Sequence, residues 1–448
     1  MTTARISIES AAPRAPGPAT FEFDTDKRAR APNWPVIAKQ RISPINYARL
    51  LIGGRAQDEA RFSAQMRARL GADAQVSFVG RARSGLYLLT KYAIARTGRR
   101  RVLLSPYTIP DVVAMVLLAG GEPVFYDFTP NSTSCDVAGL AQQMDGEAAC
   151  VIVTHYHVNE PRLGEISALC AANGAFLFKD CALALGGVIE GRPVGVIGDA
   201  CVFSLSSFKL LNYFWGGMIT TRNRDIAAYV EIETRDWPRL TARDYHHQAR
   251  ACFVYDMASR PALFNLAVFP RFRKRAAETG VAQSLDNERR DTLSLHPTLT
   301  SRPALAAFAE WSGKLERAEV QLAHRRAIAG VYERRLGAFM VSARAPRAGA
   351  CFVNYPLIVP GGARDGVRRA MMEAGFDVGA SLYPNAHRHP LYAGLPGRSA
   401  NIDALVRDTL YLPTHFGVTP AYAARLADAL APRLGAAAGA SPHAIAAE

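Results

Sequence analysis

The chain has 448 residues and is 49% hydrophobic, which is enough for an extensive core and for two or three domains. Its formal charge of +14 indicates an anionic partner, and the scattered arginines, with no zinc-finger, RNP or basic-zipper pattern, favour an anionic small molecule over nucleic acid. Seven cysteines without any CxxC pair exclude a disulfide framework and a cysteine-based zinc site, so we expect no metal and a cytoplasmic location.

Both ends of the chain predict flexible segments. Residues 1–40 are rich in Ala, Pro and Arg, and their first twenty residues lack the apolar core of a secretory signal. Residues 436–448 predict a flexible tail. The longest apolar run, residues 112–119, is far too short to span a membrane.

The middle of the chain alternates between short apolar runs and segments of helical length. The runs predict strands at 101–105, 122–126, 150–155, 175–179, 200–205 and 216–221. The segments between most of them predict helices at 84–97, 108–119, 136–145 and 164–173. Such alternation indicates a mostly parallel sheet covered by helices on both faces, which we expect in a large α/β domain over residues 41–300.

The C-terminal part has a different pattern. Residues 302–336 have helical periodicity with charged faces and predict one long helix or two. A strand is expected at 351–359, a helix at 363–374 and a last helix at 419–432. These elements predict a smaller α+β domain over residues 301–435.

Two ionisable residues follow predicted strands at the edge where ligands bind in such sheets. Asp180 comes directly after one strand, and Lys209 comes four residues after another. Taken singly, an aspartate there is usually a helix N-cap and a lysine is usually solvated. Together they fit pyridoxal 5'-phosphate, because a buried lysine becomes a nucleophile and a buried carboxylate needs a proton-bearing partner, here the ring nitrogen.

The phosphate of such a cofactor requires backbone N–H groups at a helix start, together with hydroxyl groups. The stretch GRARSGLYLL, residues 80–89, supplies Arg83, Ser84 and a glycine where a helix is expected to begin. Ser204 is a candidate for a second hydroxyl.

From about residue 45 to 432 the chain resembles the DegT/DnrJ/EryC1/StrS family of fold-type I PLP-dependent enzymes, best known as sugar aminotransferases. The matching pieces are RSGLYLL, SPYTIPDVVAMVLLAGGEPVFYDF, DCALALGGVIEGRPVGVIGDACVFSLSSFK, WGGMITT and YLPTHFGVT, in the order of the family. The third piece, which runs from Asp180 to Lys209, is the most specific.

The resemblance implies a fold-type I structure with a seven-stranded, mostly parallel sheet, and a homodimer. It implies that Lys209 forms the Schiff base and moves protons, that Asp180 holds the ring nitrogen, and that Ser204, Ser84 and the backbone of Arg83 contact the phosphate. The implied reaction moves an amino group from an amino acid such as glutamate to a keto-sugar or related keto or aldehyde intermediate. Such reactions belong to cell-surface polysaccharide or specialised-metabolite biosynthesis.

The chain departs from the family at four positions. Ile109 stands where an aromatic residue usually stacks on the cofactor ring, and Leu183 replaces a Gln or His. Thr300 stands near an Asn that the partner subunit usually supplies, and Trp215 replaces an acidic residue. The acceptor therefore need not be an ordinary nucleotide sugar, and Ile109 and Leu183 keep a PLP-dependent lyase, dehydratase or condensing enzyme open as the alternative. A non-catalytic PLP-binding protein is a third reading, which the Asp180 and Lys209 pair disfavours.

Three histidines and one inserted segment complete the candidates. His155 ends a predicted strand near the cofactor, where it contacts the cofactor or is a core histidine, and His387 and His389 are substrate-side candidates. Residues 235–300 are longer than the usual connection. The segment 251–275 predicts either a subdomain that packs on the body or a docking surface for a membrane, a carrier protein or a nucleotide diphosphate.

Overall fold

The computed structural model describes residues 44–156, 160–279, 297–341 and 348–439. The predicted N-terminal arm lies outside these residues. The last helix, α15 (Pro420–Gly439), continues seven residues beyond its predicted end at 432, because the added sequence, RLGAAAG, is rich in alanine, the best helix former. Part of the predicted tail is therefore helical. None of the described helices is long and apolar enough to cross a membrane.

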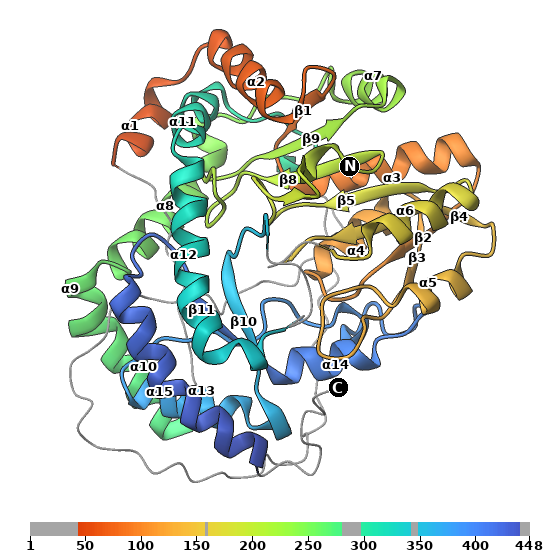
Figure 1. Ribbon diagram of the computed structural model, residues 1–448. Helices are drawn as coiled ribbons and strands as arrows, with labels where there is room; N and C mark the ends of the chain where they lie inside the picture. The colour runs from red at the N-terminus through yellow and green to blue at the C-terminus, as the bar shows by residue number, and fades with distance from the viewer. Residues whose placement is uncertain (1–43, 157–159, 280–296, 342–347, 440–448) are drawn as a thin grey trace.

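A seven-stranded sheet forms the centre of the molecule, in the order β1-β9-β8-β5-β4-β2-β3 (Figure 1). Strands β3, β2, β4, β5 and β8 run parallel, whereas β9 pairs antiparallel with both β8 and β1. Its strands are β1 (Gln75–Val79), β2 (Arg101–Leu104), β3 (Glu122–Phe125), β4 (Ala148–Thr154), β5 (Phe176–Asp180), β8 (Ala200–Ser204) and β9 (Gly217–Thr221). All six predicted strands are confirmed.

The direction of β9 follows from the connection that precedes it. Residues 205–216 join β8 to β9 without a helix, and a parallel crossover usually needs one. The chain therefore turns back antiparallel, and this turn carries Lys209. The predicted sheet did not include β1, in which only two of five residues are buried.

Helices cover both faces of the sheet, as predicted. Successive strand residues such as Leu103 and Leu104 point to opposite faces of the sheet and join different core clusters. One face packs under α3 (Ala82–Thr97), α4 (Pro110–Leu118) and α7 (Arg224–Thr234). The other packs against α5 (Val137–Gln143) and α6 (Leu163–Ala172).

The predicted helical stretch 302–336 is two helices, α11 (Leu305–Leu315) and α12 (Ala318–Leu336). Helix α11 packs Phe308 and Trp311 against Phe62 of α2 (Ala56–Leu70) and so shares the core of the large sheet. The boundary at 301 stays a prediction, and this packing favours placing it after α11.

The C-terminal elements build a second, smaller layer below the sheet (Figure 1). Strands β10 (Asn354–Ile358) and β11 (Thr409–Pro413) pair antiparallel, and their apolar side chains share a core with α12, α13 and α15. The helices of this part, besides α12 and α15, are α13 (Arg364–Glu373) and α14 (Ala400–Asp408). The predicted strand at 351–359 and helix at 363–374 are confirmed.

The inserted segment is mostly helical from residue 242 to residue 279. It contains α8 (Ala242–Ala258), α9 (Pro261–Leu263), a π-helical turn at Phe264–Val268 and α10 (Phe269–Thr279), and residues 280–296 lie outside the description. Tyr245 and Cys252 of α8 join the large core, and Phe264 and Phe269 pack with Met372 of α13. The insertion thus packs on the body, while docking through 251–275 stays a prediction. The structure also contains α1 (Pro44–Ile52) and the hairpin β6 (Val188–Ile189) and β7 (Arg192–Pro193).

Candidate active site

A cavity of about 840 Å³ opens at the carboxyl edge of the sheet. Thr154, Asp180 and Ser204, the last residues of β4, β5 and β8, all line it. The opposite wall comes from β10, β11 and the segment 379–384. The cavity therefore lies at the edge where ligands bind in such sheets.

Asp180 and Lys209, the pair singled out from the sequence, both line this cavity. The Asp180 carboxyl is buried, and its Oδ1 accepts a hydrogen bond of 2.9 Å from the amide of Ala182. Burial raises the pKa of Asp180, and the Ala182 amide and the charge of Lys209 oppose this only in part. Such a carboxyl favours a partner that shares a proton with it, as a ring N–H does.

The start of α3 lies beside this pair. Arg81, Ala82 and Arg83 line the cavity, and Ser204 Oγ lies 2.9 Å from Ser206 Oγ, which also lines it. A Cβ on Gly217 would stand 2.5 Å from the backbone of Arg81 and Ala82, so this close approach requires glycine. Backbone N–H groups at a helix start with nearby hydroxyls can hold a phosphate.

The two phosphate candidates at this helix start, Ser84 and Arg83, lie differently with respect to the cavity. Ser84 is buried and is not among the cavity-lining residues, and its Oγ has no hydrogen-bond partner in the described part of the chain. Its contact with the phosphate stays a prediction; α3 begins at Ala82, two residues before the predicted start. Arg83 lines the cavity, and its guanidinium pairs with Asp111.

Ile109 and Leu183 line the cavity as predicted, whereas Trp215 does not. The guanidinium of Arg81 lies 3.8 Å above the centre of the Trp215 ring, a cation–π contact that holds Arg81 at the cavity wall. Burial, helped by the charge of Arg83, lowers the pKa of Arg81 to about 9. Trp215 therefore acts on the cavity through Arg81. Thr300 is exposed and does not line the cavity.

The three candidate histidines lie outside the cavity lining. His155 donates its backbone N–H to the carbonyl of Asp180 at 2.9 Å, and burial lowers the pKa of its imidazole well below the ordinary value. The ring nitrogens of His387 lie 2.9 Å from the carbonyl of Leu395 and 3.1 Å from Ser399 Oγ. His389 packs on the ring of Tyr392. The substrate-side role of His387 and His389 stays a prediction; the preceding segment 379–384 lines the cavity, and these two side chains do not.

Sequence reasoning missed the cationic side chains on the C-terminal wall. Arg325 of α12 is 9% exposed, and burial lowers its pKa; Arg364 of α13 donates to the carbonyl of Val406 at 3.3 Å. The charged side chains that line the cavity are Arg81, Arg83, Lys209, Arg325 and Arg364 against Asp111 and Asp180. The excess of cations suits an anionic ligand, which the net charge of the chain indicated only in general terms.

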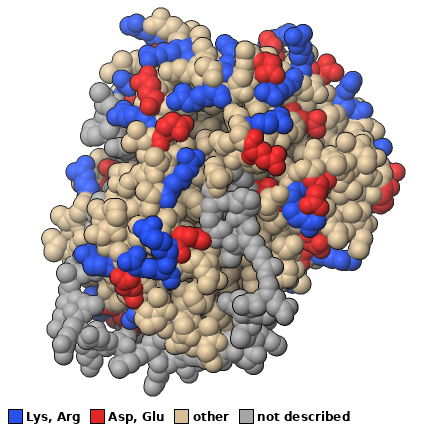
Figure 2. Space-filling view, in the orientation of Figure 1, with Lys and Arg blue, Asp and Glu red and all other residues tan. Residues whose placement is uncertain are grey.

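The molecular surface shows no comparable separation of charge on the face in view. Basic and acidic side chains are interspersed over that face (Figure 2). The concentration of cations therefore belongs to the cavity lining.

Comparison with known proteins identifies the same family as the sequence motifs. The profile of the DegT/DnrJ/EryC1/StrS aminotransferase family matches residues 50–258 and 306–431. GDP-perosamine synthase of Vibrio cholerae is 25% identical over 186 residues, which are 42% of this chain and 50% of that protein. The chain spans about half or less of the length of the curated relatives it matches.

Solved structures share the fold. The aminotransferase TlmJ of Streptoalloteichus hindustanus superposes with a TM-score of 0.66 at 19% identity, covering 91% of this chain and 100% of that one. Helicobacter pylori PseC, an aminotransferase involved in the biosynthesis of pseudoaminic acid, has a TM-score of 0.66 at 14% identity, covering 90% and 99%. The predicted fold-type I architecture is confirmed.

Proposed function

Because the chain belongs to the DegT/DnrJ/EryC1/StrS aminotransferase family, we propose that it is a pyridoxal-5'-phosphate-dependent aminotransferase with Lys209 as the Schiff-base lysine. The family is PLP-dependent. The observation that carries the proposal is that Lys209 and the buried Asp180 line one cavity at the carboxyl edge of the sheet, next to a helix start.

The cofactor, when bound, supplies an electron sink for the carbon that carries the amino group. Asp180 then holds the proton of the ring nitrogen, and its raised pKa makes this shared proton favourable. Lys209 moves a proton to and from the reacting carbon. The backbone at the start of α3 and the hydroxyls of Ser204 and Ser206 hold the phosphate.

We propose an amino acid such as glutamate as the donor and a keto-sugar or related keto or aldehyde compound as the acceptor. The names of the relatives support a place in polysaccharide or specialised-metabolite biosynthesis. The cations of the cavity, among them Arg325 and Arg364, support an acceptor with an anionic group. A homodimer in the cytoplasm is part of the proposal, and the seven cysteines, which are buried and form no disulfide in the structure, support a reducing compartment.

A second reaction class has one observation in its favour. Ile109 and Leu183 both line the cavity, so neither the expected ring-stacking aromatic nor the expected polar side chain is supplied at those positions. The bond that reacts is the one the site holds perpendicular to the cofactor ring, and different contacts can select a different bond. A lyase, dehydratase or condensing enzyme is therefore the alternative.

Two measurements test the proposal. The purified protein reconstituted with pyridoxal phosphate is expected to absorb visible light, and borohydride followed by peptide mass spectrometry is expected to find the reduced adduct on Lys209. Lys209→Ala, with a far-UV spectrum like wild type, is the control and is expected to give no adduct. An adduct on another lysine would overturn the assignment. Loss of visible absorbance on adding glutamate or glutamine supports the aminotransferase, and no response to any amino donor favours the alternative.

A further inference from the structure

The turn that carries Lys209 has an unusual backbone. Phe208, directly before the lysine, has φ of 69°, a left-handed conformation that is disfavoured for a residue with a bulky side chain. A residue stays in such a conformation only where its surroundings hold it, and such residues cluster at functional sites. Ser207, Phe208 and Lys209 all line the cavity.

The group that holds this turn comes from α8 in the inserted segment. The ring of Tyr255 packs edge-on against the ring of Phe208, with centroids 4.8 Å apart. Gln248 Nε2 donates to Ser207 Oγ at 3.2 Å, and Cys252 Sγ lies 3.0 Å from the same oxygen. Positions 248, 252 and 255 are spaced four and three residues apart, so they lie on one face of the helix.

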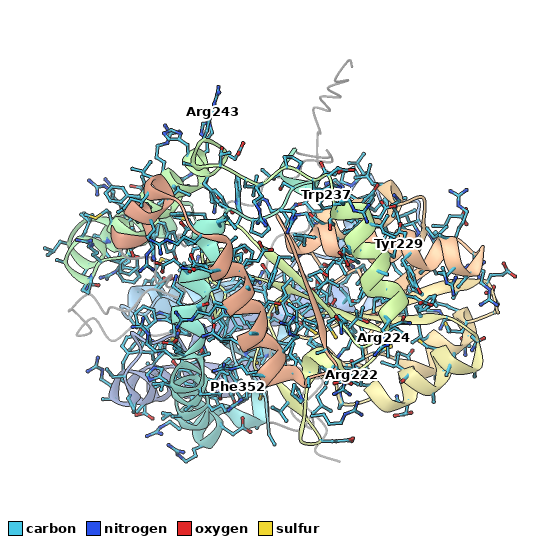
Figure 3. All side chains as sticks on the ribbon, turned by 90° about the horizontal axis from the view of Figure 1, so that it is seen from above. Arg222, Arg224, Tyr229, Trp237, Arg243 and Phe352 are labelled. Carbon is cyan, nitrogen blue, oxygen red and sulfur yellow. The ribbon has the colours of Figure 1, made fainter. Side chains whose placement is uncertain are left out.

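Helix α8 is itself anchored. At its start the Thr241 hydroxyl and amide both donate to Asp244 Oδ2 at 2.7 Å. Further along the inward side, Tyr245 packs on Trp215 with ring centroids 5.6 Å apart, and Trp215 supports Arg81. The opposite side points away from the body, as Arg243 does in Figure 3. One helix thus contacts the lysine turn directly and reaches Arg81, at the start of α3, through Trp215.

We propose that α8 is a positioning element for Lys209: the Tyr255 ring and the Gln248 and Cys252 side chains hold Phe208 in its left-handed conformation and so direct the lysine amine into the cavity. This inference rests on the role of Lys209 in the proposed function. Tyr255 and Gln248 are positioning residues, since they act through Phe208 and Ser207.

The first experiment changes the ring contact. Tyr255→Leu removes the ring and Tyr255→Phe keeps it. Val254→Ala is the control, because it changes a neighbour on the same helix that is 60% exposed. The readout is the pH titration of the visible absorbance of the borohydride-sensitive Lys209 adduct, with the melting temperature of the cofactor-free protein measured beside it. We expect Tyr255→Leu to shift the titration midpoint by about 0.5–1 pH unit. A displaced Lys209 nitrogen loses part of the interaction by which the cavity favours one of its protonation states over the other. Tyr255→Phe and Val254→Ala are expected to titrate like wild type.

The second experiment relieves the backbone. Glycine adopts positive φ without a steric penalty, so Phe208→Gly no longer needs the contacts with α8 to hold this conformation. The same change also removes the phenyl ring that packs against Tyr255. If α8 acts through Phe208, adding Tyr255→Leu to Phe208→Gly shifts the midpoint by much less than Tyr255→Leu does alone. Equal shifts in both backgrounds would overturn the proposal.

A lower melting temperature with an unchanged midpoint in Tyr255→Leu means that α8 only stabilises the fold, which also overturns the inference. If Tyr255→Leu does not fold, Gln248→Met, which removes the donor to Ser207, takes its place with the same readouts. Failure of the proposed function looks different, because wild-type protein itself would then carry no adduct on Lys209.

Discussion

The hydroxyl groups of Tyr107 and Tyr411 lie 2.6 Å apart and join the loop after β2 to strand β11. Ser381 Oγ lies 3.1 Å from the same Tyr107 hydroxyl, and both Ser381 and Tyr411 line the cavity. Burial raises the pKa of both tyrosines, so both stay protonated at neutral pH. This pair therefore fixes the C-terminal wall of the cavity against the large sheet.

We predict that Tyr107→Phe destabilises the protein by about 1–3 kcal/mol, because it leaves the buried Tyr411 hydroxyl without this partner. The measurement is the shift of the urea unfolding midpoint. Tyr107→Phe combined with Tyr411→Phe removes both hydroxyls and is expected to recover part of the loss. A double variant less stable than the sum of the singles would contradict this account.

The stability of the cofactor-free protein is expected to depend on pH through Asp180. Burial raises the pKa of this carboxyl, so its protonated form favours the folded state. The contribution is complete below the ordinary pKa of an aspartate and is lost as the pH rises through the raised value. Wild type should therefore lose stability relative to Asp180→Asn as the pH rises from about 4 towards neutral. Urea midpoints of both apoproteins across this range check it, and a constant difference would count against the shift.

Arg81 is expected to contribute to phosphate binding. Arg81→Met keeps an aliphatic stem over Trp215 but removes the charge, and it should weaken binding of pyridoxal phosphate by about 10- to 100-fold. Arg100→Met is the matched control, since its guanidinium lies at the surface and donates to the carbonyl of Gly120. Fluorescence titration of the apoproteins measures both affinities. Equal affinities for the two variants would remove Arg81 from the phosphate site.

The central strands and the Asp180 and Lys209 pair were predictable because buried parallel strands are short continuous apolar runs. The start of α3 was predicted two residues late, at 84 in place of Ala82. A helix turns by about 100° per residue, so this difference changes which side chains are expected to face the cavity. Ser84 was named for this helix start, whereas Arg81, which lines the cavity, was not.

The C-terminal wall of the cavity was not predictable from local sequence. Arg325, Arg364 and Tyr411 come from three separate elements, more than 100 residues after Lys209 along the chain. These residues come together because the second layer packs against the sheet. The hydrophobic periodicity of the sequence does not indicate how the two layers pack. Strand β11 was missed for a related reason, because it pairs with β10 in a two-stranded sheet of the second layer.

Arg325 offers a test that separates binding from stability. It is 9% exposed, no ion pair joins it to an acidic side chain within the described residues, and a buried cation without a counter-ion destabilises a fold. Arg325→Gln should therefore leave the melting temperature of the apoprotein unchanged or raise it. The same change should weaken binding of an anionic substrate by about 10- to 100-fold, since a charge-assisted hydrogen bond is lost.

The neighbouring Arg326→Gln is the control, because Arg326 Nε donates to the carbonyl of Ala350 and does not line the cavity. The visible absorbance at increasing glutamate concentration measures the affinity for the amino donor. Competition by inorganic phosphate or pyrophosphate measures the affinity for the anionic group of the acceptor. A loss of affinity in only one of these two assays tells which anion Arg325 binds. Wild-type affinity in both assays, or a lower melting temperature for Arg325→Gln than for Arg326→Gln, would make Arg325 a structural residue.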